Sequence, residues 1–231
     1  SDQTRTDETN IARRRVPRLA VINNGSLLWD EDVRAALQYS DWVSVKIDAA
    51  DPDLWRRIDR PARALDFQRV TDGIRRFRAE YDRFFATETM LVNGLNDHEE
   101  AVTGLAELLA ELAPDVAYLS VPTRPPAVEW ALPPDESAVT AIYHTIESTG
   151  LSVELNVGSE EGAFEGAGSI EESVLAIASV HPIRESSLRE LVHEKGGEWE
   201  QIEALVAADR LVRKAYRGES FYVRRLKPRR R

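Results

Sequence analysis

Residues 87–126 decide the fold of this chain and read TETMLVNGLNDHEEAVTGLAELLAELAPDVAYLSVPTRPP. The segment predicts a strand, a helix and a second strand. Polar loops follow the two strands, at residues 93–97 and 122–126. In parallel α/β folds, ligands bind in the loops at the carboxyl ends of strands. The segment therefore predicts a binding site at this edge of a parallel sheet.

The same alternation extends over residues 16–150. Short apolar strands are predicted at 19–22, 42–48, 86–92 and 116–121, and amphipathic helices at 30–39, 66–81, 97–112 and 135–147. Apolar strands separated by amphipathic helices imply a parallel sheet covered by helices. We therefore predict an α/β fold, a partial parallel (β/α) barrel of about four strand–helix units.

The pattern changes after Gly150. Residues 151–168 predict one more strand and a linker rich in Gly and Glu, whereas residues 1–15 predict a polar N-terminal tail. Ser169 and Glu172 have the spacing of a capping box at the start of a helix. Two further helices and a β-hairpin follow, so residues 169–231 predict a small winged-helix-like domain with a basic tail.

Composition excludes several kinds of chemistry. The 231 residues contain no cysteine, which removes disulfides, thiolate metal sites and cysteine nucleophiles. The four histidines lack ligand-like spacing, so we predict no metal site. No apolar run is long enough to span a membrane and no secretory signal is present, so we expect a cytoplasmic protein without membrane partners. A net charge of −10 argues against a broad nucleic-acid-binding face but leaves a local one open.

Five strand-end motifs occur in order along the chain. They are Asn24-Gly25-Ser26-Leu27-Leu28, Val45-Lys46-Ile47-Asp48-Ala49, Arg60-Pro61, the segment from Glu88 to Asp97, and Arg124-Pro125-Pro126. Together they resemble the radical S-adenosylmethionine (SAM) superfamily, and more narrowly its branch related to tRNA wyosine-base synthases. The resemblance covers residues 16–222 and implies a partial (β/α) barrel that binds SAM, followed in some members by a small C-terminal domain.

The chain departs from the family at the cluster-binding loop. The family binds a 4Fe–4S cluster through a CxxxCxxC loop and holds the methionine end of SAM with a Gly-Glu-Pro motif, and both are absent here. The resemblance then implies the last four barrel units of a longer enzyme, with a truncated chain, a split gene and a degenerate homologue left open. We expect that this chain alone binds no 4Fe–4S cluster and does not cleave SAM.

The resemblance also implies which residues bind the cofactor. Lys46 and Asp48 would meet the ribose and amino-acid part of SAM, and Asn93, Asn96 and Asp97 would lie near the adenine. The complete set of expected cofactor-binding residues is Asn24, Ser26, Lys46, Asp48, Asn93, Asn96 and Arg124.

For several of these residues, a structural role that involves no cofactor stays open as the alternative. Lys46 and Asp48 would form an internal salt bridge, Asp97 would be a helix N-cap, residues 23–26 a turn, and residues 124–126 a rigid exit turn. The catalytic residues are not identified by the sequence.

The sequence also predicts partners of the chain and rival functions. A partner is expected in the form of a missing N-terminal segment or a split-gene product. Residues 19–22 form an apolar edge, so we expect self-association unless residues 1–15 cover it. The rival hypotheses are a non-catalytic homologue that binds a partner or RNA, and an unrelated small α/β enzyme that uses Lys46 and Asp48 as an acid–base pair.

Overall fold

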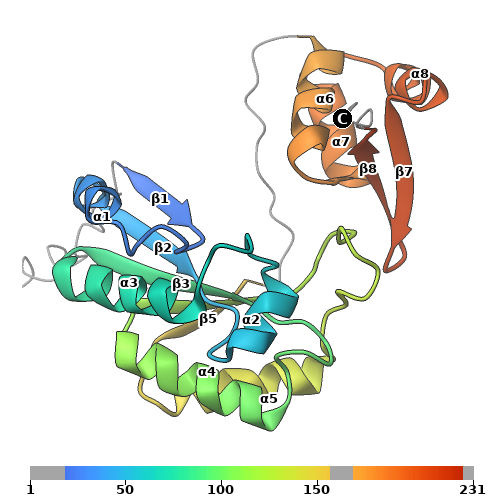
Figure 1. Cartoon of the computed structure of the whole chain (residues 1–231). Helices are drawn as coiled ribbons and strands as arrows, with labels where there is room; N and C mark the ends of the chain where they lie inside the picture. The colour runs from blue at the N-terminus through green and yellow to red at the C-terminus, as the bar shows by residue number, and fades with distance from the viewer. Residues whose placement is uncertain (1–18, 157–168, 226–231) are drawn as a thin grey trace, which may run out of the picture. The chain divides into compact units, whose positions relative to one another are not determined.

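The computed structural model describes residues 19–156 and 169–225 and divides the chain into two compact units (Figure 1). The first unit consists of the residues up to Met90 together with Gly94–Ser120 and Glu136–Leu155. The second consists of Leu91–Asn93, Val121–Asp135 and the residues from Asn156 onward. The predicted tail, the linker after residue 156 and the basic residues after Arg225 lie outside the described residues.

The first unit contains a five-stranded sheet whose strands follow the order of the chain. They are β1 (Ala20–Asn23), β2 (Trp42–Lys46), β3 (Phe84–Met90), β4 (Val116–Ser120) and β5 (Val153–Asn156). The helices between them are α1 (Glu31–Leu37), α2 (Pro52–Ile58), α3 (Phe67–Glu80), α4 (Glu99–Leu112) and α5 (Glu136–Glu147). The pairing is parallel, which confirms the α/β prediction of strand–helix units in series.

Helix α2 is not among the helices predicted from the sequence, and its segment contains Asp and Pro residues that are typical of loops. The structure shows that both residue types start the helix. The Asp51 side chain accepts hydrogen bonds from the backbone N–H groups of Asp53 and Leu54, and Pro52 occupies the first turn. Proline is favoured there because its missing N–H group would have no helical partner.

An aromatic cluster joins α3 to the sheet. Phe77 is fully buried, stacks on Tyr81 with ring centroids 4.9 Å apart, and meets Phe85 of β3 edge-on at 6.2 Å. The Tyr81 hydroxyl donates to the Ser40 carbonyl at 2.9 Å, and burial raises the pKa of Tyr81. The folded state thus favours the neutral phenol, and this contribution to stability is lost as the pH rises above 10.

The loop after β1 also packs tightly on α3. A Cβ atom added at Gly73 would lie 2.3 Å from the backbone nitrogen of Trp29. Only glycine permits this approach of loop and helix. Arg34, which is 7% exposed, secures the same region by donating to the carbonyls of Leu28 and Trp29.

The second unit contains an antiparallel sheet in the order β6-β8-β7. Its elements are α6 (Ile170–Val180), β6 (Ile183–Arg184), α7 (Glu185–Glu194), α8 (Glu200–Ala207), β7 (Leu211–Tyr216) and β8 (Glu219–Arg224). The capping box of Ser169 and Glu172 is present. The predicted hairpin is the β7–β8 pair, and the winged-helix assignment stays a prediction. No helix of the described residues is both long and apolar enough to cross a membrane.

The edge strand β1 generates the first prediction. Among the described strands β1 has a neighbour on one side only, and Ile22 is 71% exposed. An open apolar edge favours pairing with another chain, and a lysine there opposes it. We expect Ile22→Lys to reduce concentration-dependent association in sedimentation velocity. Leu27→Lys, at a 52% exposed site outside the strand, is the control. A parent chain that is monomeric at every concentration would contradict the prediction.

The aromatic cluster generates the second prediction. Phe77→Ala removes a fully buried ring and leaves a cavity between α3 and β3. We expect the free energy of unfolding to fall by about 3–5 kcal/mol in urea denaturation. Tyr39→Ala is the matched control, because Tyr39 is 79% exposed and its loss should cost less than about 0.5 kcal/mol. Equal losses in the two variants would show that the cluster is not the core of the first unit.

Candidate functional site

The carboxyl ends of β2 and β3 are joined by side-chain hydrogen bonds. Oδ1 of Asp48 accepts from the backbone N–H of Met90 at 2.9 Å. Nδ2 of Asn96 donates to the carbonyls of Asp48 and Met90, both at 2.9 Å. Asp48 and Asn96 are each 1% exposed. Both predicted site residues therefore satisfy buried backbone groups where the strands end, and the fold itself uses most of their hydrogen-bonding capacity.

Two hydroxyl groups extend this network to β4. Oγ1 of Thr89 donates to the carbonyl of Ile47 at 2.6 Å, and Oγ of Ser120 donates to the carbonyl of Thr89 at 3.2 Å. Thr89 and Ser120 are buried. Side chains thereby pair the carbonyl groups at the ends of β2 and β3, and β4 contributes one of the donors, so this edge of the sheet is a rigid platform.

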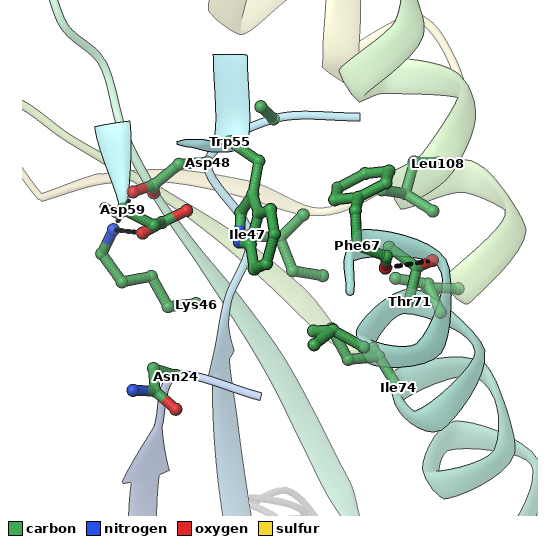
Figure 2. Close-up of a pocket in the computed structure, with 13 residues that line it drawn as sticks. Asn24, Lys46, Ile47, Asp48, Trp55, Asp59, Phe67, Thr71, Ile74 and Leu108 are labelled. Carbon is green, nitrogen blue, oxygen red and sulfur yellow. Dashed lines mark hydrogen bonds and ion pairs between the residues drawn. The ribbon is translucent and has the colours of Figure 1, made fainter. Parts of the chain in front are cut away.

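Lys46 lies between two carboxylates. Its Nζ atom forms an ion pair with Oδ2 of Asp48 and lies 2.7 Å from Oδ1 of Asp59 (Figure 2). Asp59 comes from the end of α2, so the lysine links the strand end to that helix. The side chains of Lys46 and Asp59 are 36% and 20% exposed. The internal salt bridge expected as an alternative is present. Because Asp48 is buried and engaged through both oxygens, the geometry does not favour an acid–base pair of Lys46 and Asp48.

A small cavity adjoins this cluster. Its apolar lining includes Trp55, Phe67, Ile74 and Leu108, and Figure 2 shows Lys46, Asp48 and Asp59 on the side of Trp55 away from Phe67 and Leu108. The volume is about 20 Å³. A buried water needs roughly 10–15 Å³ by this measure, whereas ligand pockets span roughly 300–1,000 Å³. The cavity therefore holds about one water and does not enclose a nucleoside.

The other face of the sheet carries a row of polar side chains beside Lys46. Phe85 of β3 contacts α3, and side chains alternate along a strand, so Lys46 and Glu88 project to the opposite face. Lys46 is the register partner of Glu88, which is in turn the partner of Tyr118 on β4. All three are partly exposed. Glu88 and Tyr118 were not among the predicted site residues, because only strand register shows that they neighbour Lys46.

Asn24 and Ser26 belong to the turn after β1. Oδ1 of Asn24 accepts from the backbone N–H of Ser26 at 3.1 Å, and Gly25 between them has φ of +71°. The turn expected as an alternative is therefore present. Asn24 also lines the cavity beside Lys46, so the structure brings Asn24, Lys46 and Asp48 together. Ser26 does not line this cavity.

The remaining predicted residues lie in loops. Asn93 and Arg124 belong to the second unit, where Asn93 is exposed and its backbone N–H donates to the Leu132 carbonyl at 2.8 Å. The N-cap prediction for Asp97 is wrong, since the cap of α4 is His98. The Asp97 carboxylate accepts instead from the backbone N–H of Gly94 and closes the loop, because one more residue separates it from the helix than expected.

No metal cluster fits the residues of this chain. The full sequence has no cysteine to ligate iron. In the described ranges, 19–156 and 169–225, no group of three or more His, Asp or Glu residues is arranged to hold a metal ion. A 4Fe–4S cluster needs thiolate ligands, so this chain does not supply its site.

Comparisons with known proteins identify a family and relatives of this chain. The model of the family described as "Radical SAM superfamily" matches residues 3–106. A UPF0026 protein of Methanocaldococcus jannaschii is 36% identical over 213 residues, which cover 91% of this chain and 66% of that protein. A UPF0026 protein of Synechocystis sp. is 33% identical over 105 residues, which cover 46% of this chain and 39% of that protein.

A solved structure shares the fold. The radical SAM methyltransferase from Sphaerobacter thermophilus has a TM-score of 0.51 at 20% identity, over 62% of this chain and 41% of that one. The chain spans about two thirds of the archaeal relative and less than half of the cyanobacterial one. The narrower assignment to the wyosine-related branch stays a prediction.

The strand-end network generates the third prediction. Asn96→Ala removes two hydrogen bonds and leaves buried carbonyl groups unpaired. We expect the free energy of unfolding to fall by about 2–4 kcal/mol in urea denaturation. Asn93→Ala is the matched control, because Asn93 is exposed and its backbone N–H makes the hydrogen bond to Leu132. If Asn93→Ala were as destabilising as Asn96→Ala, the strand-end network would not be the stabilising element.

Proposed function

Since the chain belongs to the radical SAM superfamily, we propose that it supplies the SAM-binding strand ends of a radical SAM enzyme whose cluster ligands come from another polypeptide segment. The observation that carries the proposal is the row of Lys46, Glu88 and Tyr118, which runs across three parallel strands from the carboxyl end of β2, in a chain without cysteine. Ligands of parallel α/β folds bind at this edge.

The chemistry of the row suits the polar groups of SAM. A carboxylate such as Glu88 accepts hydrogen bonds from ribose hydroxyls, and the Lys46 ammonium pairs with the carboxylate of the methionine part. The Glu88 carboxylate makes no hydrogen bond or ion pair with the described residues, so it is available to a ligand, whereas the Glu88 backbone carbonyl accepts from the Ile47 N–H. Lys46 is held in position by Asp48 and Asp59 and still exposes about a third of its side chain.

The open edge of the sheet supports a cluster-bearing segment as the partner. β1 is unpaired on one side among the described strands, and Leu19 and Ile22 beside it are 48% and 71% exposed. A parallel strand added there would cover apolar surface and pair the free backbone groups. The segment would carry three cysteines, in the same chain or in a separate one. The bound cluster would supply the electron that the family delivers to SAM.

The cluster requirement can be tested directly. The DNA upstream of the codon for Ser1 is sequenced, the extended chain or the neighbouring gene is expressed, and both forms are reconstituted anaerobically with iron and sulfide. We expect cluster absorption and release of 5′-deoxyadenosine from SAM only when the cysteine-bearing segment is present. Cluster assembly by this chain alone, or an upstream region and neighbouring genes without cysteine motifs, would overturn the proposal and favour a non-catalytic binding protein.

Glu88 generates the fourth prediction. In the reconstituted protein, Glu88→Gln should weaken SAM binding about tenfold, which is about 1.4 kcal/mol, in isothermal titration calorimetry. The melting temperature should not change, because the Glu88 carboxylate forms no hydrogen bond or ion pair with the described residues. Glu107→Gln on the exposed side of α4 makes the same charge change and should bind SAM within twofold of the parent. Equal affinities for the parent and Glu88→Gln would exclude Glu88 from the site.

A further inference from the structure

Charge is strongly segregated within the second unit. Residues 210–225 contain six basic residues and one acidic residue, whereas residues 169–209 contain nine acidic and three basic ones. The basic residues lie on and beside the β7–β8 hairpin. In a chain with a net charge of −10, this hairpin is a local positive surface.

Several of these cations already have partners. Arg210 pairs with Glu171, and Arg225 pairs with Asp209 at 2.9 Å. Arg213 donates to the Ser220 hydroxyl at 2.7 Å and lies 3.4 Å from Glu185. Glu185 is itself held by Arg189, whose hydrogen bond lowers the pKa of that carboxyl group. These pairs hold the hairpin to its unit and contribute little free positive charge.

Lys214 and Arg217 differ from these paired cations. Both side chains are exposed, and neither makes a hydrogen bond or an ion pair with the residues that the structure describes. Lys214 lies on β7, which is an edge strand of the sheet. Arg217 occupies the tip of the hairpin. These two cations are therefore available to an external anion.

The geometry of the tip presents Arg217 to solvent. Tyr216 pairs with Glu219, so Arg217 and Gly218 form a two-residue loop, with φ of +49° and +82°. Loops of this kind favour Asn-Gly, because a Cβ atom is strained at positive φ and asparagine tolerates this conformation better than other residues with a Cβ atom. An arginine in the asparagine position gives up some turn stability and places a guanidinium group at the most exposed point of the hairpin.

We propose that the β7–β8 hairpin binds the phosphate backbone of nucleic acid through Lys214 and Arg217. Guanidinium and ammonium groups are the usual phosphate ligands, and arginine binds phosphate with two parallel hydrogen bonds. Helix α8 does not take part, because its exposed Glu200 and Glu203 would repel the backbone. The contact therefore depends on phosphate charge and not on base sequence.

Other anionic partners fit the hairpin less well. A membrane-binding surface needs apolar anchors, and Leu211, Phe221 and Tyr222 are buried at 1%, 0% and 5% exposure. A protein interface needs an apolar or aromatic centre, and the exposed side chains of the hairpin are charged or small. A backbone of repeated phosphates requires only spaced cations, which the hairpin provides.

The fifth prediction tests this surface with the full chain. Binding of a fluorescently labelled single-stranded RNA is followed by anisotropy at several salt concentrations. We expect the double variant Lys214→Gln with Arg217→Gln to bind at least fivefold more weakly than the parent at low salt. Its slope of log K against log salt concentration should be smaller by about 1.4, since each lost phosphate contact on a single strand removes roughly 0.7. Single-stranded DNA of the same length should respond in the same way.

The matched control is Arg63→Gln with Arg76→Gln. Both residues are exposed in the first unit, and the double variant makes the same change in net charge. Its RNA affinity should stay within twofold of the parent. Absence of saturable RNA binding at low salt, or equal loss in both double variants, would overturn the proposal. Stronger binding to phosphatidylserine vesicles or to polyglutamate than to RNA of equal charge would also overturn it, in favour of a membrane or protein partner.

Discussion

The pairing of backbone groups at the carboxyl ends of β2 and β3 by buried side chains is the constraint on which the first unit depends. Parallel strands separate there as each chain segment turns toward its helix, and the last carbonyl groups lose their neighbours. Asn96 donates to two of these groups, and Thr89 and Ser120 donate to two others. Without them, buried carbonyl groups would remain unpaired at a cost of about 1–3 kcal/mol each. The polar residues at this edge therefore stabilise the fold before they serve any ligand.

This constraint divides the polar residues into two sets. Asp48 and Asn96 are buried and engaged by backbone groups, so they position the strand ends. Lys46 and Glu88 project from the same edge and stay partly exposed. Asp48 connects the two sets, because one of its oxygens accepts from a backbone N–H group and the other pairs with Lys46. A rigid platform thus holds the lysine, and rigidity of this kind lowers the entropy lost when a ligand binds.

The two units differ in their electrostatics and in the way each meets a partner. The first unit has an open apolar edge that suits a further strand, and its strand ends carry a cluster of one lysine and two carboxylates. The second unit has a small buried core and a hairpin whose cations are only partly neutralised. At physiological salt the Debye length is about 8 Å, so the exposed cations of the hairpin tip act mainly on charges within about that distance.

Much of the architecture follows from local sequence. Short apolar runs located the strands, and an apolar period of about 3.6 residues located the helices between them. Ser169 with Glu172 located the start of α6. These signals depend on residues a few positions apart. Helix α2 was missed because Asp51 and Pro52 favour turns and helix starts alike. The N-cap of α4 was misplaced by one residue because Asp97 bonds to Gly94. Only the tertiary structure decided three features of the site. They are the nearness of Glu88 to Lys46, the hydrogen bonds of Asn96 to backbone carbonyl groups, and the single-water volume of the cavity. All three depend on strand register and on packing between segments that are distant in the sequence.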